Sequence, residues 1–170
     1  MKLLKTVGIT LLVLVVLIFG ALLAFRIIMR QEIAEDYEVN SPDLETKVLI
    51  ATQGSEFKHS LVGGVVDNLK MNEIYLKVID VTGLGKVDAS EWHSILIVNT
   101  CEAGKLQKDT AGFLDRYPNK RDIILLTTSG EGTWMPENVN ADTISAASEQ
   151  DQVDNLRQVI LAKITAQLKE

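Results

Sequence analysis

The stretch KVLIATQGS, residues 47–55, decides the fold class. Its first six residues form a short apolar run rich in β-branched side chains, which is typical of a buried strand, and Gln53-Gly54-Ser55 is a turn signal. Ser55 followed by Glu56 suits the start of a helix. Apolar residues then recur at helical spacing: Phe57, Leu61, Val62, Val65, Val66 and Leu69. We therefore expect a buried strand followed directly by a helix.

The rest of the chain repeats this alternation. Further strands are expected at 73–81, 94–99, 122–127 and, more weakly, 142–147. One helix is marked by Leu106, Ala111, Phe113 and Leu114, and a final one by Val153, Leu156, Val159, Ile160 and Ile164. Short apolar strands that alternate with helices predict a doubly wound α/β domain with a parallel sheet. Ligands of such sheets bind at the carboxyl ends of the strands. The loops 52–58, 99–105 and 127–135 are therefore the candidate site.

The N-terminus has a different character. Val7 to Phe25 is a run of 19 residues without a charge, which nearly matches a hydrocarbon core of roughly 30 Å as a helix. A cleaved signal peptide is the alternative, but its apolar stretch is usually only roughly 7–15 residues long. We expect residues 1–30 to be a transmembrane anchor, with residues 7–25 in the lipid bilayer of a single-pass membrane protein. Lys and Arg are balanced at its two ends, which leaves both orientations open.

Charge separates this anchor from the rest. Residues 31–46 contain six acids, no base and Pro42, and we expect an acidic linker there before a domain over 47–170. Residues 31–170 carry 13 of the 17 bases and all 23 acids. A body this acidic repels phosphate backbones, so nucleic acid is excluded as a partner. One Cys and two His exclude a disulfide framework and a Cys/His zinc site, and no metal site is expected.

Over residues 47–168 the chain resembles the flavodoxins. The order of strands and helices fits throughout, and TCEAGKLQ at 100–107 is similar to the family's P-T-Y-x-G-x-L-P stretch. The resemblance implies a five-stranded parallel sheet in the order 2-1-3-4-5 and an FMN cofactor. The first loop would hold the phosphate, and the other two would flank the flavin ring.

The resemblance also implies a set of cofactor-binding residues and no catalytic ones. In the first loop they are Thr52, Gly54, Ser55, Glu56, Phe57 and Lys58; in the second, Thr100, Cys101, Glu102 and Gly104; in the third, Ser129, Gly130, Gly132 and Trp134. The first loop departs from the family's (S/T)-x-x-G-x-T, because Ser55 replaces the Gly and Phe57 the last Thr. Glu102 stands where the family has a stacking aromatic, which leaves Trp134 for that role. Lys58 either adds positive charge or is a surface lysine.

Two functions follow from these observations. The first is a membrane-anchored, FMN-binding electron carrier that docks on a redox partner protein. The alternative is a flavodoxin-like module that has lost its flavin and serves for interactions at the membrane. Residues 128–141 contain no amphipathic helix, although the family has one there. We therefore expect an uncovered sheet face near strands four and five, which a partner or a second copy in a homodimer would cover.

Overall fold

The protein is described by a computed structural model over residues 2–28 and 32–169, and it divides into two units, Met1–Gln31 and Glu32–Glu170. The first unit contains helix α1 (Lys2–Ile28). Among the described residues, no helix has both the length and the hydropathy of a membrane span. The predicted anchor also includes residues 1, 29 and 30, which lie outside the described residues, and it stays a prediction.

The second unit is built on a six-stranded sheet with the order β1-β3-β2-β4-β5-β6. The strands are β1 (Tyr37–Val39), β2 (Thr46–Thr52), β3 (Ile74–Asp80), β4 (Ser94–Thr100), β5 (Ile123–Thr128) and β6 (Asp142–Ala146). The five strands from β2 to β6 are parallel. Counted along the chain, their order is 2-1-3-4-5, which confirms the flavodoxin-like fold.

The predicted count of five strands is wrong, because β1 adds a sixth. It pairs antiparallel with β3, with Tyr37 opposite Val78. Glu38 on this strand forms a 2.9 Å ion pair with Lys77. The strand lies inside the stretch that we expected to be an acidic linker. With three residues, it is too short to show the alternation of apolar and polar side chains that marks a strand in a sequence.

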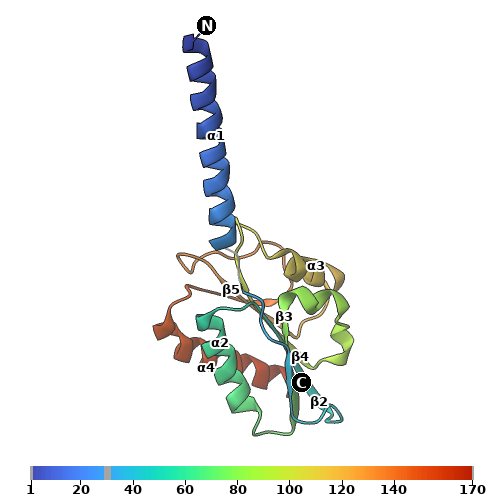
Figure 1. Cartoon of the computed structure of the whole chain (residues 1–170). Helices are drawn as coiled ribbons and strands as arrows, with labels where there is room; N and C mark the ends of the chain where they lie inside the picture. Colours follow the sequence, from blue (N-terminus) through green and yellow to red (C-terminus); the bar gives the residue numbers. More distant parts are fainter. Residues whose placement is uncertain (1, 29–31, 170) are drawn as a thin grey trace. The chain divides into compact units, whose positions relative to one another are not determined.

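Helices α2 (Glu56–Leu69) and α4 (Val153–Gln167) cover one face of the sheet, and α3 (Lys108–Arg116) lies on the other with the short helices η1 (Val81–Lys86) and η2 (Ala89–Glu91) (Figure 1). A further short helix, η3 (Gln150–Gln152), precedes α4. Ser55 caps α2 as predicted, and its hydroxyl accepts from the Lys58 N–H at 3.2 Å. Val159 was expected on the buried face of α4 but is exposed, because Leu156, Ile160 and Ile164 already form that face.

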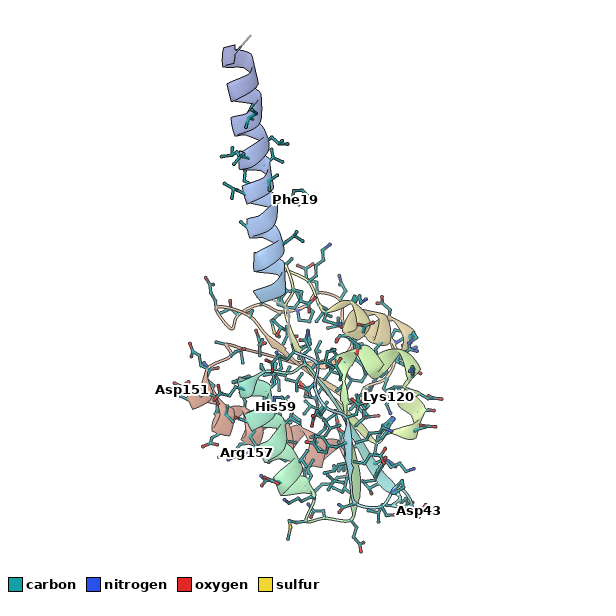
Figure 2. All side chains as sticks on the ribbon, viewed as in Figure 1. Phe19, Asp43, His59, Lys120, Asp151 and Arg157 are labelled. Carbon is teal, nitrogen blue, oxygen red and sulfur yellow. The ribbon has the colours of Figure 1, made fainter. Side chains whose placement is uncertain are left out.

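Helices α2 and α4 also approach each other closely. A Cβ on Gly64 of α2 would lie 2.8 Å from Cδ of Arg157 on α4. Figure 2 labels Arg157 on α4 and His59 on α2, the two helices that contact each other on this face of the sheet. The absence of a side chain at Gly64 therefore allows the two helices to pack as one layer.

The segment after β5 forms no helix among the described residues, as predicted, yet β5 is fully buried. Ile123 and Leu125 have no exposed surface, and Val139 and Ala141 from the irregular segment pack on their cluster. The expectation of a bare face at this strand is therefore wrong. The homodimer that it suggested stays a prediction.

Candidate functional site

The candidate site lies at the carboxyl ends of the parallel strands. β2 ends at Thr52, β4 at Thr100 and β5 at Thr128. The chain passes from β2 to β3 on one side and later returns to β4 on the other, so the strand order reverses between β2 and β4. In open α/β sheets this reversal is where ligands bind.

Gln53, which our sequence reasoning missed, bridges the two loops at this reversal. Its Oε1 accepts from the Thr100 N–H at 2.7 Å, and its Nε2 donates to Oε1 of Glu102 at 3.1 Å. The side chain is buried. An amide suits this position because it donates and accepts at once. Gln53 therefore holds the first and second loops together, although nothing in the sequence distinguishes it from a surface glutamine.

Lys58 is buried beneath the same loops, with 1% of its surface exposed. Its Nζ donates to the Thr100 hydroxyl at 2.7 Å, and that hydroxyl lies 3.2 Å from the hydroxyl of Thr128. Burial lowers the pKa of Lys58 to about 8, and the nearby Glu102 carboxylate opposes this shift. Lys58 is thus a positive charge placed among strand ends, and its interpretation as a surface lysine is wrong.

A hollow of about 420 Å³, open to solvent, lies next to Thr100, the residue that Lys58 bonds. Its lining comes from the ends of three adjacent strands: Thr100, Cys101, Thr128, Ser129, Gly130, Ala147, Ser148 and Glu149. The structure brings together four of the residues predicted from sequence, namely Thr100, Cys101, Ser129 and Gly130. The other four were missed, although the end of strand five could have been expected at this edge of the sheet.

The second loop turns away from the hollow beyond Cys101. Glu102 and Lys105 bond each other through both backbone N–H groups, at 2.8 and 3.1 Å. Ala103 and Gly104 between them have φ values of 50° and 76°, as a tight hairpin turn of this kind requires. Glu102 and Gly104 are exposed and do not line the hollow.

The third loop folds back on β6. Gly132 has a φ of 69°, and a Cβ there would lie 2.4 Å from the Ala147 backbone nitrogen. The Trp134 N–H donates to the Ser129 hydroxyl at 3.4 Å, and its carbonyl accepts from the Ser145 hydroxyl at 2.7 Å. Trp134 is half-buried and does not line the hollow.

The first loop is covered by the segment of residues 32–36, which we call the strap. The Gly54 N–H donates to the Glu32 carbonyl at 2.7 Å, and a Cβ on Gly54 would lie 2.7 Å from Cβ of Glu32. Thr52 is buried, and its hydroxyl donates to the Gln53 carbonyl at 3.1 Å. Phe57 belongs to the core beneath α2, whereas Glu56 is exposed.

No protein-family model and no curated protein matches the chain. Among solved structures, it is similar to a general stress protein 14 from Treponema denticola in complex with FMN, at 11% identity over 72% of this chain and 99% of that one, with a TM-score of 0.41. It is also similar to a flavodoxin, WrbA-like protein from Agrobacterium tumefaciens, at 11% identity over 73% and 98%, with a TM-score of 0.43.

Proposed function

We propose that the domain binds FMN at the carboxyl edge of its sheet and carries electrons. The observation that supports this best is the hollow at the ends of β4, β5 and β6, next to Thr100, which the buried Lys58 bonds. Its size is in the range of roughly 300–1,000 Å³ that is common for ligand sites. Its position beside the reversal of strand order agrees with the ligand position in flavodoxin-like folds.

The lining offers hydrogen bonds on one side and space on the other. The hydroxyls of Thr100, Thr128, Ser129 and Ser148 would bond the polar edge of the cofactor. Gly130 has open space where a Cβ would stand, so the backbone there permits a close approach. When bound, FMN supplies the electron-transfer chemistry, and the protein sets position and potential. The carboxylates of Glu102 and Glu149 would disfavour added negative charge and lower that potential.

The proposal places the domain at a membrane. The uncharged run from Val7 to Phe25 supports this, because its length suits a bilayer-spanning helix. The excess of acids after residue 30 suits docking on a basic redox partner protein. The side of the membrane is left open, because Lys and Arg are balanced at the two ends of the run.

A flavin-less interaction module is the second candidate. Two observations favour it: the strap fills the space beside Gly54, and the residues that line the hollow include no aromatic side chain. Without a ring to stack on, a flavin would lose the contact that usually orients it.

The test is flavin retention by the full chain in a mild detergent. FMN is added, the protein is desalted, and its visible absorbance spectrum is recorded. Gly130→Leu should block the hollow without a clash, and Gly112→Leu is its matched control, because both glycines are exposed with open space around the Cβ position. We expect flavin absorbance with the wild type and Gly112→Leu, and its loss with Gly130→Leu. If the wild type retains no flavin and is colourless, the electron-carrier proposal is refuted and the flavin-less interaction module remains.

Bound FMN should also shield Cys101, the single cysteine, which lines the hollow and is half-buried. We expect a maleimide to react more slowly with Cys101 when FMN is present. An unchanged rate together with retained flavin would place the cofactor elsewhere on the domain.

A further inference from the structure

The strap is attached to the carboxyl edge of the sheet by three hydrogen bonds. The first joins the Gly54 N–H to the Glu32 carbonyl at 2.7 Å. Further along, the Ala34 N–H donates to Oδ2 of Asp80 at 2.8 Å, and Oδ1 of Asp36 accepts from the Asp80 N–H at 2.8 Å. The strap therefore crosses the ends of β2 and β3, where the first loop of the proposed cofactor site begins.

Asp80 is an acceptor that does not need the strap for its orientation. Its Oδ1 accepts from both the N–H and the hydroxyl of Thr82, at 2.9 and 2.6 Å. The carboxylate is thus held in place by its own loop, and its Oδ2 faces the strap. The Asp80 carboxylate, on which the strap docks, would therefore stay in position after the strap is displaced.

The strap has little else to hold it. Ala34 is its only buried residue, and Ile33 is 71% exposed. Local opening is easiest where few apolar contacts are buried. Displacement of the strap should therefore cost far less than unfolding of the sheet.

The strap covers the positive charge of the site. A small cavity lies between the strap and α2, and its lining includes Ala34, Gln53 and Lys58. The strap also carries three acids, Glu32, Glu35 and Asp36. In the closed arrangement it takes the Gly54 N–H, borders the cavity that Lys58 also lines, and carries negative charge where a phosphate would approach.

We propose that the strap is a displaceable lid on the first loop. When it is closed, a phosphate has no access to the Gly54 N–H or to Lys58; when it is displaced, both become available. The inference rests on the proposed FMN binding, because it assigns the phosphate of that cofactor to the first loop. In the closed form, FMN and riboflavin, which lacks the phosphate, should bind with equal affinity in the hollow.

The lid is tested by the reactivity of Lys58 in the full chain. Ala34→Pro removes the N–H that bonds Asp80, and Asp36→Ala removes the acceptor of the Asp80 N–H. Glu38→Ala is the control, because it breaks an exposed ion pair on β1 and leaves the strap bonds intact. Acetylation is followed by mass spectrometry, with the exposed Lys70 as internal reference. We expect Lys58 to react at least about tenfold faster in the two strap variants, and inorganic phosphate to slow it again.

Two outcomes would overturn the lid. One is acetylation of Lys58 at the wild-type rate in both strap variants. The other is faster acetylation that inorganic phosphate leaves unchanged. The acetylation rate of Lys58 is measured without flavin, so it tests the lid independently of the proposed function. A protein that binds no flavin would refute the proposed function and leave the lid to be decided by acetylation.

Where flavin binds, the ratio of the riboflavin to the FMN dissociation constant should rise about tenfold or more in both strap variants and stay near one in Glu38→Ala. An equal ratio of dissociation constants in the two strap variants and in Glu38→Ala would refute the role of the lid in phosphate binding.

Discussion

Lys58 on α2 and Thr100 at the end of β4 are 42 residues apart in the chain, yet the ammonium donates a 2.7 Å hydrogen bond to the hydroxyl. The bond joins the helix that follows the first loop to the strand that leads into the second. Burial disfavours the charged form of a lysine, so this contact places a cation where the fold has little solvent to stabilise it. The properties of the site should therefore depend on the protonation of Lys58.

The pH dependence of stability should report Lys58. Its pKa is about 8 in the folded protein against an ordinary value of 10.5. Between these values the unfolded chain binds more protons, so the free energy of unfolding should rise with pH, by on the order of 1–3 kcal/mol. Below about pH 8 both states are protonated and this contribution is constant. Urea unfolding of the wild type and of Lys58→Met at several pH values measures this rise in the free energy of unfolding, which the variant should lack. If the free energy of unfolding depends on pH in the same way in both proteins, the assignment to Lys58 is contradicted.

Replacement of Gln53 should loosen the second loop. In Gln53→Leu, the Thr100 N–H loses its acceptor at 2.7 Å, and an unsatisfied donor of this kind costs about 1–3 kcal/mol. We expect that loss in urea unfolding and faster amide hydrogen exchange at Thr100. Gln158→Leu, at an exposed position on α4, is the control and should change stability by less than about 0.5 kcal/mol. Unchanged exchange at Thr100 would show that another group accepts its N–H.

A methyl group on Gly54 should push the strap away. Its Cβ would stand 2.7 Å from Cβ and 2.8 Å from the carbonyl oxygen of Glu32. We expect Gly54→Ala to cost about 1–2 kcal/mol in unfolding free energy, the size of the lost strap contacts. Gly63→Ala, within α2 and with nothing within 4 Å, should instead stabilise by about 0.5–1 kcal/mol.

The strap contacts also predict a coupling. Gly54→Ala and Ala34→Pro act on the same segment, so the double variant should lose less stability than the sum of the single ones. If the losses in unfolding free energy are strictly additive in a double-mutant cycle, Gly54 and Ala34 do not act through the same attachment of the strap.

The third loop should tolerate no side chain at Gly132. Gly132→Ala combines a φ of 69° with a Cβ only 2.4 Å from the Ala147 nitrogen. Because both backbones must move, we expect a loss of about 2–4 kcal/mol and a change in the hollow, which Ala147 helps to line. Gly104→Ala, with a φ of 76° but open space, should lose only about 1–2 kcal/mol. Thermal unfolding of both variants gives the two losses in stability. Equal losses would show that the close approach of Gly132 to Ala147 adds no cost of its own.

The sheet was predictable because its information is local. Four of the strands are short apolar runs and the fifth is a weaker one, and the helix that starts at Ser55 has both a cap and a periodic face. The strand β1 was not predictable, because its support comes from pairing with β3, which lies far away in sequence. The burial of β5 was missed for a related reason. Val139 and Ala141 are isolated apolar residues in an irregular segment, and only the fold shows what they cover.

The site was predictable only in position. The carboxyl edge and its loops follow from the alternation of strands and helices, and Thr100, Cys101, Ser129 and Gly130 were named within those loops from the resemblance to flavodoxins. Gln53 and the strap were missed, because their roles depend on partners across the sheet rather than on a motif. Lys58 shows a different failure: helical spacing puts it on the same face as Val65 and Leu69, but its charge left a surface position open, and only the structure shows it buried against Thr100.

The order of the strap's attachments has a mechanical consequence. A pulling force transmitted along the chain from before residue 32 would load the Glu32–Gly54 bond first, then Ala34–Asp80, then Asp36–Asp80, and only afterwards β1. Tension would therefore reach the first loop before it reaches the sheet. A tether that ends at this segment would make the domain a force sensor, in which a modest load exposes Lys58 while the sheet stays intact.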